Sequence, residues 1–288
     1  MEKIYVIGAT GKIGQEVVRG RLSNGIPTTV FARREEKHRR LFGESEHLSF
    51  VQGDYQNMDG FRRTIKGHTR LFLLISDFKN MAIHTSAFAK LSYDAGVSQI
   101  VHISSIGASL PWRAYIIGTL HRDAEESILA IPNRGAYVAL RPASFFSNQY
   151  MGDANTIKSK NMIFGTASGD ETKDWISTKD ISDLALVILQ DPIEKHGDAV
   201  YEMSSEAISG DDRAKLLSKA LGRTITYATV DLEQEYNKFL SLGFPHSLAY
   251  AFSAYNHEAY ITPALSLLLG RKPESMEDWF LLHKERFL

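Results

Sequence analysis

Three glycines stand close together near the amino terminus, within the stretch GATGKIG. Gly8, Gly11 and Gly14 follow the apolar run IYVI and precede a helical pattern over residues 12–22. Glycines at such a place let a phosphate approach the backbone N–H groups of a helix N-terminus, where the helix dipole favours negative charge. We therefore expect a dinucleotide pyrophosphate to bind here, and the alternative is a purely structural turn. Residues expected along the phosphate path are Thr10, Lys12 and Ile13.

Two arginines follow the next apolar run, TTVFA. In dinucleotide-binding folds an acidic residue at this point binds the ribose 2′-hydroxyl of NAD. This chain instead has Arg33 and Arg34. A guanidinium is permanently charged and makes bidentate contacts with phosphate. The pair predicts NADP(H) as the cofactor, and the alternative is an ordinary solvated start of a basic helix.

The elements that must position these residues alternate along the first two thirds of the chain. Apolar, β-branched runs typical of strands begin at Ile4, Thr28, Leu48, Leu71, Gln99 and Ala136. Helical patterns cover residues 12–22, 58–66, 79–95 and 118–130. This alternation predicts an α/β fold with a doubly wound parallel sheet, the Rossmann arrangement. Ligands in such sheets bind outside the carboxyl ends of the strands.

The last third of the chain changes character. A helix is expected over residues 179–192 and a strand near Ala199. We expect a nucleotide-binding core in residues 1–150, completed by about 175–205. A smaller, mainly helical substrate lobe is expected in 206–288 with parts of 151–174, the whole forming one continuous unit.

Aromatic residues gather in the predicted lobe between Tyr236 and Tyr260, Tyr255 among them. They are expected to wall a pocket for a flat, apolar substrate. The alternative is that they form the core of the lobe. The stretch HEAYI at His257 lacks the second histidine of an H-E-x-x-H zinc motif, since position 261 is isoleucine. We predict no metal.

Composition narrows the classes of partner. The net charge is −1, and 23% of residues are charged, which argues against nucleic acid or a membrane surface as the main partner. The absence of cysteine excludes disulfides, thiolate nucleophiles and iron–sulfur clusters. The chain runs directly into its first strand, and no apolar run reaches the length of a membrane span. We expect a cytoplasmic protein, monomeric or homodimeric, that acts on a small molecule.

Four stretches occur in the same order in the NmrA-like proteins, an atypical branch of the short-chain dehydrogenase/reductase superfamily. They are GATGKIG, VQGDYQN, IVHISSIGA and LRPASFFSNQ, and WISTKDISDLA and LLGRKPESMEDW also look like stretches of this family. The sequence resembles this family over nearly its whole length. The family includes NADPH-dependent quinone reductases and dye-reducing enzymes, and also redox-sensing regulators that bind the cofactor with little or no catalysis.

The resemblance implies roles for matching positions around the cofactor. Asp54 would bind the adenine amino group with Tyr55 beside it, and Ser76 would lie along the ribose. Residues implied near the nicotinamide are Ser104, Ser105, Pro142, Phe145, Phe146 and Asn148. The alternatives are ordinary ones, because a serine pair often closes a strand and a phenylalanine pair often belongs to a core.

The proton donor that usually accompanies hydride transfer in short-chain dehydrogenases is missing. That donor is a tyrosine with a lysine four residues later, and none of the 12 tyrosines has one. Tyr115 is the nearest candidate by position, with Thr119 four residues on. His121 and Glu125 lie one helical turn apart, and a carboxylate neighbour would favour a charged imidazolium able to donate a proton. The alternative is an exposed pair of small energetic value.

Two functions follow from these residues. The first is an NADPH-dependent oxidoreductase that transfers hydride to a quinone-like or other conjugated molecule, with His121, Ser105 and Tyr115 as catalytic candidates. Such acceptors need a positioned acid less, because their reduced forms take protons from water. The second is a non-catalytic NADP(H) sensor acting through a protein partner.

Overall fold

The computed structural model describes residues 2–254 and 258–288. These residues form two compact units. The first contains the residues up to Ser109, then Gly118–Arg141 and Ile181–Glu202, and the second contains Leu110–Ile117, Pro142–Asp180 and Met203–Leu288. In the described part of the chain, no helix is both long enough and apolar enough to cross a membrane.

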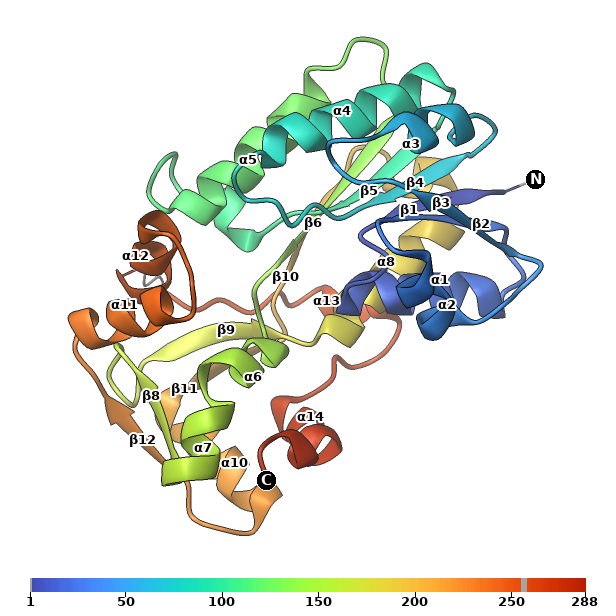
Figure 1. The fold of residues 1–288 in the computed structure, drawn as a ribbon. Coiled ribbons are helices and arrows are strands. Elements are labelled where there is room, and N and C mark those ends of the chain that lie inside the picture. The colour runs from blue at the N-terminus through green and yellow to red at the C-terminus, as the bar shows by residue number, and fades with distance from the viewer. Residues whose placement is uncertain (1, 255–257) are drawn as a thin grey trace. The chain divides into compact units, whose positions relative to one another are not determined.

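The first unit is built on a seven-stranded sheet with the order β10-β6-β5-β4-β1-β2-β3 (Figure 1). Pairing is parallel from β3 through to β6. The doubly wound sheet expected from the sequence is therefore confirmed, and its order reverses between β1 and β4. The strands are β1 Ile4–Ile7, β2 Thr28–Ala32, β3 Leu48–Gln52, β4 Arg70–Leu73, β5 Gln99–Ile103, β6 Ala136–Pro142 and β10 Val200–Met203.

Helices cover both faces of this sheet, with α3, α4 and α5 on one face and α1, α2 and α8 on the other (Figure 1). This arrangement explains why β1 and β4 are buried along their whole length and why all their residues except Arg70 are uncharged and mainly apolar. The helices are α1 Lys12–Ser23, α2 Glu35–Phe42, α3 Asp59–Thr64, α4 Met81–Asp94, α5 Ile116–Leu129 and α8 Thr178–Gln190, followed by the single turn α9 Ile193–His196.

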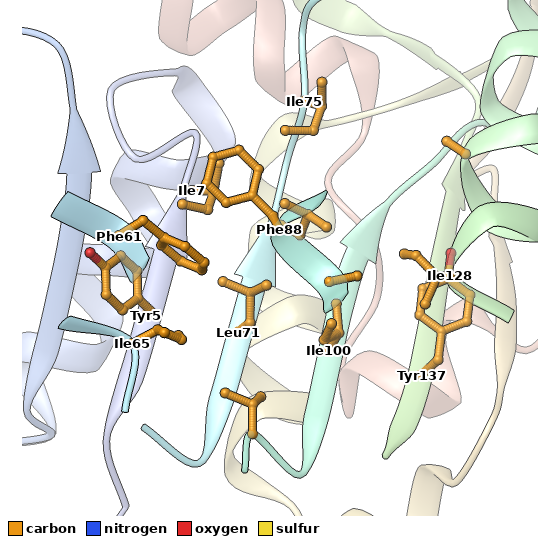
Figure 2. Close-up of a cluster of buried hydrophobic side chains, with 14 of the residues drawn as sticks. Tyr5, Ile7, Phe61, Ile65, Leu71, Ile75, Phe88, Ile100, Ile128 and Tyr137 are labelled. Carbon is orange, nitrogen blue, oxygen red and sulfur yellow. The ribbon is translucent and has the colours of Figure 1, made fainter. Parts of the chain in front are cut away.

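An apolar core fills the space between the sheet and the α3–α4–α5 layer (Figure 2). Phe61 and Phe88 meet edge to face at 4.8 Å between ring centroids, and Tyr5 meets Phe61 in the same way at 4.8 Å. Leu71 and Ile100 from the central strands are completely buried beside them. Each such side chain contributes about 1.5–3 kcal/mol by leaving water.

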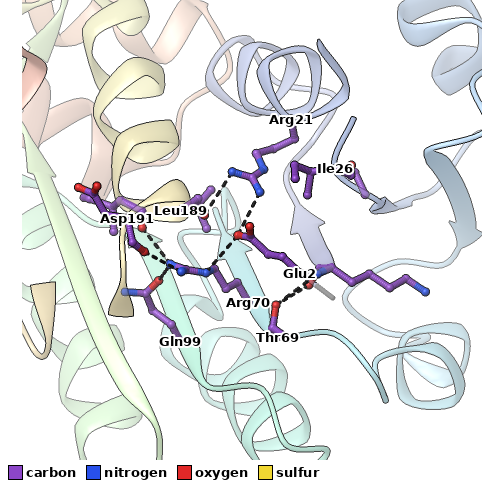
Figure 3. Close-up of polar contacts among 11 residues, drawn as sticks. Glu2, Arg21, Ile26, Thr69, Arg70, Gln99, Leu189 and Asp191 are labelled. Atoms are coloured by element: carbon purple, nitrogen blue, oxygen red, sulfur yellow. Dashed lines mark hydrogen bonds and ion pairs between the residues drawn. The ribbon is translucent and has the colours of Figure 1, made fainter. Parts of the chain in front are cut away.

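The opposite end of the sheet, where β1 and β4 begin, carries a buried charged cluster (Figure 3). The Glu2 carboxylate contacts Arg21 at 3.0 Å and Arg70 at 3.3 Å. Arg21 also donates to the carbonyl of Leu189, and Arg70 donates to that of Asp191. One carboxylate thus balances the charge of two buried guanidinium groups. The cluster lies at the amino ends of the strands, away from the carboxyl ends where a ligand is expected.

The second unit has more strands than its sequence suggested. A three-stranded sheet has the order β11-β9-β7, and β8 pairs with β12 in parallel. Its core gathers Phe146, Trp175, Met276, Trp279 and Phe280. The strands are β7 Ser144–Phe145, β8 Met162–Gly165, β9 Thr172–Ile176, β11 Glu206–Ser209 and β12 Thr226–Thr229. Its helices are α6 Gln149–Gly152, α7 Ala154–Lys160, α10 Gly210–Leu221, α11 Leu232–Ser241, α12 His246–Ala254, α13 Leu265–Leu269 and α14 Met276–His283.

Candidate cofactor site and active site

The glycine loop leaves the carboxyl end of β1 at the point where the strand order reverses. Gly8 has a φ of +85°, and a Cβ there would lie 2.8 Å from the carbonyl oxygen of Leu74, just beyond β4. A Cβ on Gly14 would lie 2.3 Å from the carbonyl oxygen of Gly8. Both glycines are therefore required by the turn and by the approach of helix α1 to β1.

Gly11 differs from the other two glycines of the loop. It precedes helix α1 with φ −86° and ψ 168°, and the nearest atom to a Cβ there is 3.5 Å away. The protein itself therefore leaves room for a side chain at Gly11. Gly11 and Lys12 are exposed, and no side chain in residues 2–254 or 258–288 caps this helix start. A dinucleotide pyrophosphate fits such a helix N-terminus, which offers N–H groups and has no acidic residue in its first turn.

Arg33 and Arg34 follow β2, which lies next to β1 in the sheet. Ile7 pairs with Phe31, so the glycine loop and the two arginines leave the same edge of the sheet from adjacent strands. Both arginines are exposed, and among the described residues no carboxylate pairs with either guanidinium. By contrast, Arg39 in the following helix is bound by Glu35 at 2.9 Å.

Asp54 follows β3 in a tight turn. One of its carboxylate oxygens accepts from the backbone N–H groups of Gln56 and Asn57, at 2.9 and 2.8 Å. A Cβ on the preceding Gly53 would lie 2.3 Å from the ring of Phe31, so this glycine lets the turn lie close to β2. The turn fixes the Asp54 carboxylate at the same edge of the sheet as the glycine loop.

Tyr55 and Ser76, predicted as neighbours of the cofactor, are brought together by the structure. The backbone N–H of Ser76 donates to the Tyr55 hydroxyl at 3.3 Å. The Tyr55 ring stacks on His84 with 5.0 Å between centroids, and His84 Nε2 lies 3.1 Å from Asp77. These contacts tie the loop after β3 to the loop after β4.

Ser104 and Ser105, which directly follow β5, have different surroundings. Ser104 is 4% exposed, and its hydroxyl donates to Glu125 on α5. Ser105 is half-buried, and its hydroxyl oxygen accepts from the N–H of Gly107 at 3.2 Å. Of the pair, Ser105 is the one with solvent access at the carboxyl end of the strand.

The expected imidazolium at His121 is wrong. Burial lowers the pKa of His121 to about 3, the neighbouring His102 acts in the same direction, and Glu125 opposes both without reversing the shift. Desolvation of the charged form outweighs the attraction of one carboxylate. His121 is therefore neutral at pH 7. Its ring is partly exposed, yet Nδ1 is enclosed and has no hydrogen-bond partner among the described residues.

The expected hydrogen-bonded pair of His121 and Glu125 is also not formed, because the carboxylate is occupied elsewhere. Glu125 is 3% exposed and receives Nε of Arg141 at 2.9 Å and Nη2 of the same residue at 2.5 Å, besides the Ser104 hydroxyl. The Glu125 carboxylate raises the pKa of Arg141. This ion pair was not predicted, since the two residues lie on a helix and a strand with no sequence motif to link them.

Five predicted site residues lie in the second unit, and one of them, Asn148, is exposed. Tyr115 is half-buried just before α5. Pro142 is buried, Phe145 is half-buried in β7, and Phe146 is completely buried with its ring 6.0 Å from that of Trp279. The position of Phe146 favours the alternative reading of a core residue.

The aromatic segment forms a helical hairpin, α11 and α12. Phe239, Phe244 and Phe252 contact one another at 5.2–5.9 Å between centroids, which makes them the core of the hairpin. The Tyr236 hydroxyl bonds Nδ1 of His246 at 3.0 Å, and Tyr250 is 62% exposed. Tyr255 and His257 lie outside the described residues. Among the described residues, no three acidic or histidine side chains lie together in a group that could hold a metal.

Comparison with known proteins agrees with this geometry. The NAD(P)H-binding family model matches residues 8–192, and the NmrA-like family model matches residues 125–280. An NAD(P)H azoreductase of Xenophilus azovorans is 26% identical over 294 residues, covering 99% of both chains.

Two solved structures have the same fold over nearly the full length. An NADPH-dependent quinone oxidoreductase of Escherichia coli in complex with NADPH gives a TM-score of 0.81 at 21% identity, covering 98% of this chain and 99% of the other. The triphenylmethane reductase of Citrobacter sp. in complex with NADP(H) gives 0.79 at 19% identity, with the same coverage.

The two family models overlap at residues 125–192, and each covers more than half of the chain. The glycine loop lies at the start of the first match, and the second match takes in most of the second unit. The chain therefore belongs to the NmrA-like family and carries its NAD(P)H-binding Rossmann fold.

Proposed function

We propose that this protein is an NADPH-dependent reductase that transfers hydride to a quinone-like or other conjugated small molecule. The observation that carries the cofactor choice is the pair of exposed, unpaired guanidinium groups of Arg33 and Arg34 beside an uncapped, glycine-lined helix start. A 2′-phosphate would supply the counter-charge that these two guanidinium groups lack. NADH has no 2′-phosphate and would leave the two guanidinium groups without a counter-charge.

The remaining cofactor contacts follow from the order of the loops along the sheet. Asp54 and Tyr55 would hold the adenine, and Ser76 the adjacent ribose, since the loops after β3 and β4 are tied together by the Tyr55 hydroxyl. Ser105 would lie near the nicotinamide. The glycine loop positions for the pyrophosphate are Gly8, Thr10, Gly11, Lys12, Ile13 and Gly14, and the positions proposed around the nicotinamide are Ser104, Pro142 and Phe145.

Support for catalysis comes from the activities named for the proteins that match this chain over nearly its whole length. The azoreductase and the triphenylmethane reductase act on conjugated molecules by their names, and so does the quinone oxidoreductase. A conjugated acceptor also suits the second unit, where Tyr236 and Tyr250 remain at least partly exposed on the α11–α12 hairpin. NADPH supplies the hydride when it is bound.

Proton delivery must then work without a charged histidine. With a pKa of about 3, His121 at neutral pH orients a substrate oxygen or nitrogen through a hydrogen bond and does not act as a strong acid. Tyr115 is the other candidate donor. Water can complete the protonation of a reduced quinone or dye. We therefore expect turnover to show no titration near pH 6.5.

The cofactor choice is tested by Arg33→Ala with Arg40→Ala as the matched control. Arg40 is an exposed arginine on the following helix. Losing a charge-assisted contact worth about 1.5–3 kcal/mol should raise the Kd for NADPH roughly 10- to 150-fold and leave that for NADH nearly unchanged. Arg40→Ala should change neither value. Equal losses for NADPH and NADH at Arg33 would show that this residue does not bind the 2′-phosphate.

Catalysis is tested by NADPH oxidation with a panel of quinones, azo dyes and triphenylmethane dyes. Turnover with at least one acceptor is expected. Tight NADPH binding with no oxidation across the panel would refute the reductase and favour a cofactor sensor that acts through a protein partner. We further propose a cytoplasmic monomer or homodimer, which fractionation and sedimentation would test.

A further inference from the structure

A buried ion pair stands at the carboxyl ends of β5 and β6, and the proposed chemistry does not use it. Arg141 ends the part of β6 that belongs to the first unit, and Glu125 lies on α5. Their side chains are 18% and 5% exposed and meet through two hydrogen bonds of the fork type, at 2.9 and 2.5 Å. Such bidentate pairs fix orientation as well as distance.

The pair extends into a chain of contacts that joins three strand ends. Glu125 receives the hydroxyl of Ser104 from the end of β5. Arg141 donates through Nη1 to Ser109 at 2.9 Å, and the Ser109 hydroxyl in turn bonds Glu202 on β10. The carboxyl ends of β5, β6 and β10 are thus held by one guanidinium group.

The same contacts fasten residues 104–109 along helix α5. Gly118 of α5 is so close to this segment that a Cβ there would lie 2.1 Å from the carbonyl oxygen of Gly107. One turn later, Arg122 donates to the carbonyl of Ala108 at 3.2 Å. With Glu125, these positions form one face of the helix, spaced three to four residues apart. His121 lies within that run, one residue before Arg122.

We propose that Arg141 is a positioning residue for the nicotinamide end of the site. By holding Glu125, it fixes both the turn that presents Ser105 and the rotation of α5 that presents His121. The inference rests on the proposed reductase function. A purely stabilising role is the weaker reading, because a buried ion pair generally contributes little net stability beyond well-packed apolar residues.

The first unit provides a matched control on the same strand. Arg134, just before β6, forms a fork with Asp198 at 2.8 Å through both of its terminal nitrogens. That pair lies at the amino end of β6, at the opposite edge of the sheet from the proposed site. Arg141→Lys and Arg134→Lys therefore remove the same kind of contact at opposite ends of one strand.

The experiment measures kcat, the Kd for NADPH, the melting temperature and the primary isotope effect with NADPH deuterated at the transferred position. Arg141→Lys should lower kcat roughly 10- to 100-fold, as expected for reacting groups displaced by about 1 Å, with less than a threefold change in Kd. The isotope effect should rise as hydride transfer becomes limiting. Arg134→Lys should leave kcat, Kd and the isotope effect unchanged.

A second variant covers the case in which Arg141→Lys does not fold. Glu125→Leu with Arg141→Met removes both charges together and should fold. A folded double variant with low kcat and normal NADPH affinity supports positioning, whereas wild-type kcat in it, or an unchanged kcat and isotope effect in Arg141→Lys, overturns the inference. If neither variant folds, the pair is structural and the inference fails. Absence of turnover in the wild-type protein would refute the proposed function itself, and is thus a distinct result.

Discussion

Gly11→Ala and Gly14→Ala separate a glycine that a ligand needs from a glycine that the fold needs. At Gly11 the backbone φ of −86° suits any residue, and an added Cβ meets only one atom at 3.5 Å. Alanine is a poorer helix N-cap than glycine, which costs at most about 1 kcal/mol. For a unit of this size that corresponds to a fall of roughly 2–4 °C in Tm.

At Gly14 the same methyl group meets backbone. A Cβ would lie 2.3 Å from the Gly8 carbonyl oxygen and 2.8 Å from Cα of Ala9, and neither atom belongs to a flexible side chain. Overpacking of this kind costs about 3 kcal/mol, or roughly 6–12 °C in Tm. The two substitutions add one methyl group each, three residues apart, so the contrast depends only on local geometry.

Cofactor affinity should follow a different pattern from stability. A methyl group on Gly11 stands in the path of a pyrophosphate and costs at least one charge-assisted hydrogen bond, about 1.5–3 kcal/mol, which raises the Kd for NADPH roughly 10- to 150-fold. Fluorescence titration and thermal unfolding of both variants measure the two effects separately. A Gly11→Ala protein that binds NADPH like the wild type would refute pyrophosphate binding at this helix start.

Two further predictions concern stability away from the proposed site. Glu2→Gln should destabilise the protein because Arg21 and Arg70 lose their shared carboxylate, by about 1–3 kcal/mol once the partial exposure of Glu2 is allowed for. The affinity for NADPH should stay the same. An unchanged Tm would show that the charged cluster does not contribute to stability. Burial lowers the pKa of His68 to about 4 and that of His102 to about 3. Below about pH 6.5 the unfolded chain therefore binds protons that the folded chain excludes. The free energy of unfolding should be highest above about pH 6.5 and should fall toward pH 4 by up to about 1.4 kcal/mol per pH unit for each histidine. Urea unfolding at pH 7.5 and 5 measures this slope, and a His68→Gln variant with the wild-type slope would contradict it.

Sequence patterns predicted the first unit well because its elements depend on local signals. The apolar runs at Ile4 and Leu71 are buried on both faces of the sheet, and the helix after Gly11 begins at Lys12 as expected. The small sheets of the second unit were missed. Strands such as β9, with Lys173 and Asp174 in the sequence TKDWI, are short and polar, and their pairing with β11 and β7 depends on residues distant in the chain.

The candidate site was predictable in its residues and less so in their chemical state. The glycine spacing and the arginines after β2 are local features, and the structure places them on adjacent strands. The neutral state of His121 depends on burial and on the neighbouring His102, and neither follows from spacing along α5. Arg141 captures Glu125 from a strand 16 residues away, which a helical i,i+4 rule cannot anticipate.

The first unit is discontinuous, and this constrains the order in which a ribosome can complete it. Arg21 and Arg70 emerge early, but the carbonyl groups that accept their hydrogen bonds belong to Ile188, Leu189 and Asp191. The ribosome must therefore synthesise residues 142–180 of the second unit before the chain contains the carbonyl groups that bind Arg21 and Arg70. A nascent chain stalled before residue 181 would therefore contain an incomplete first unit, in which Arg21 and Arg70 lack these hydrogen-bond acceptors.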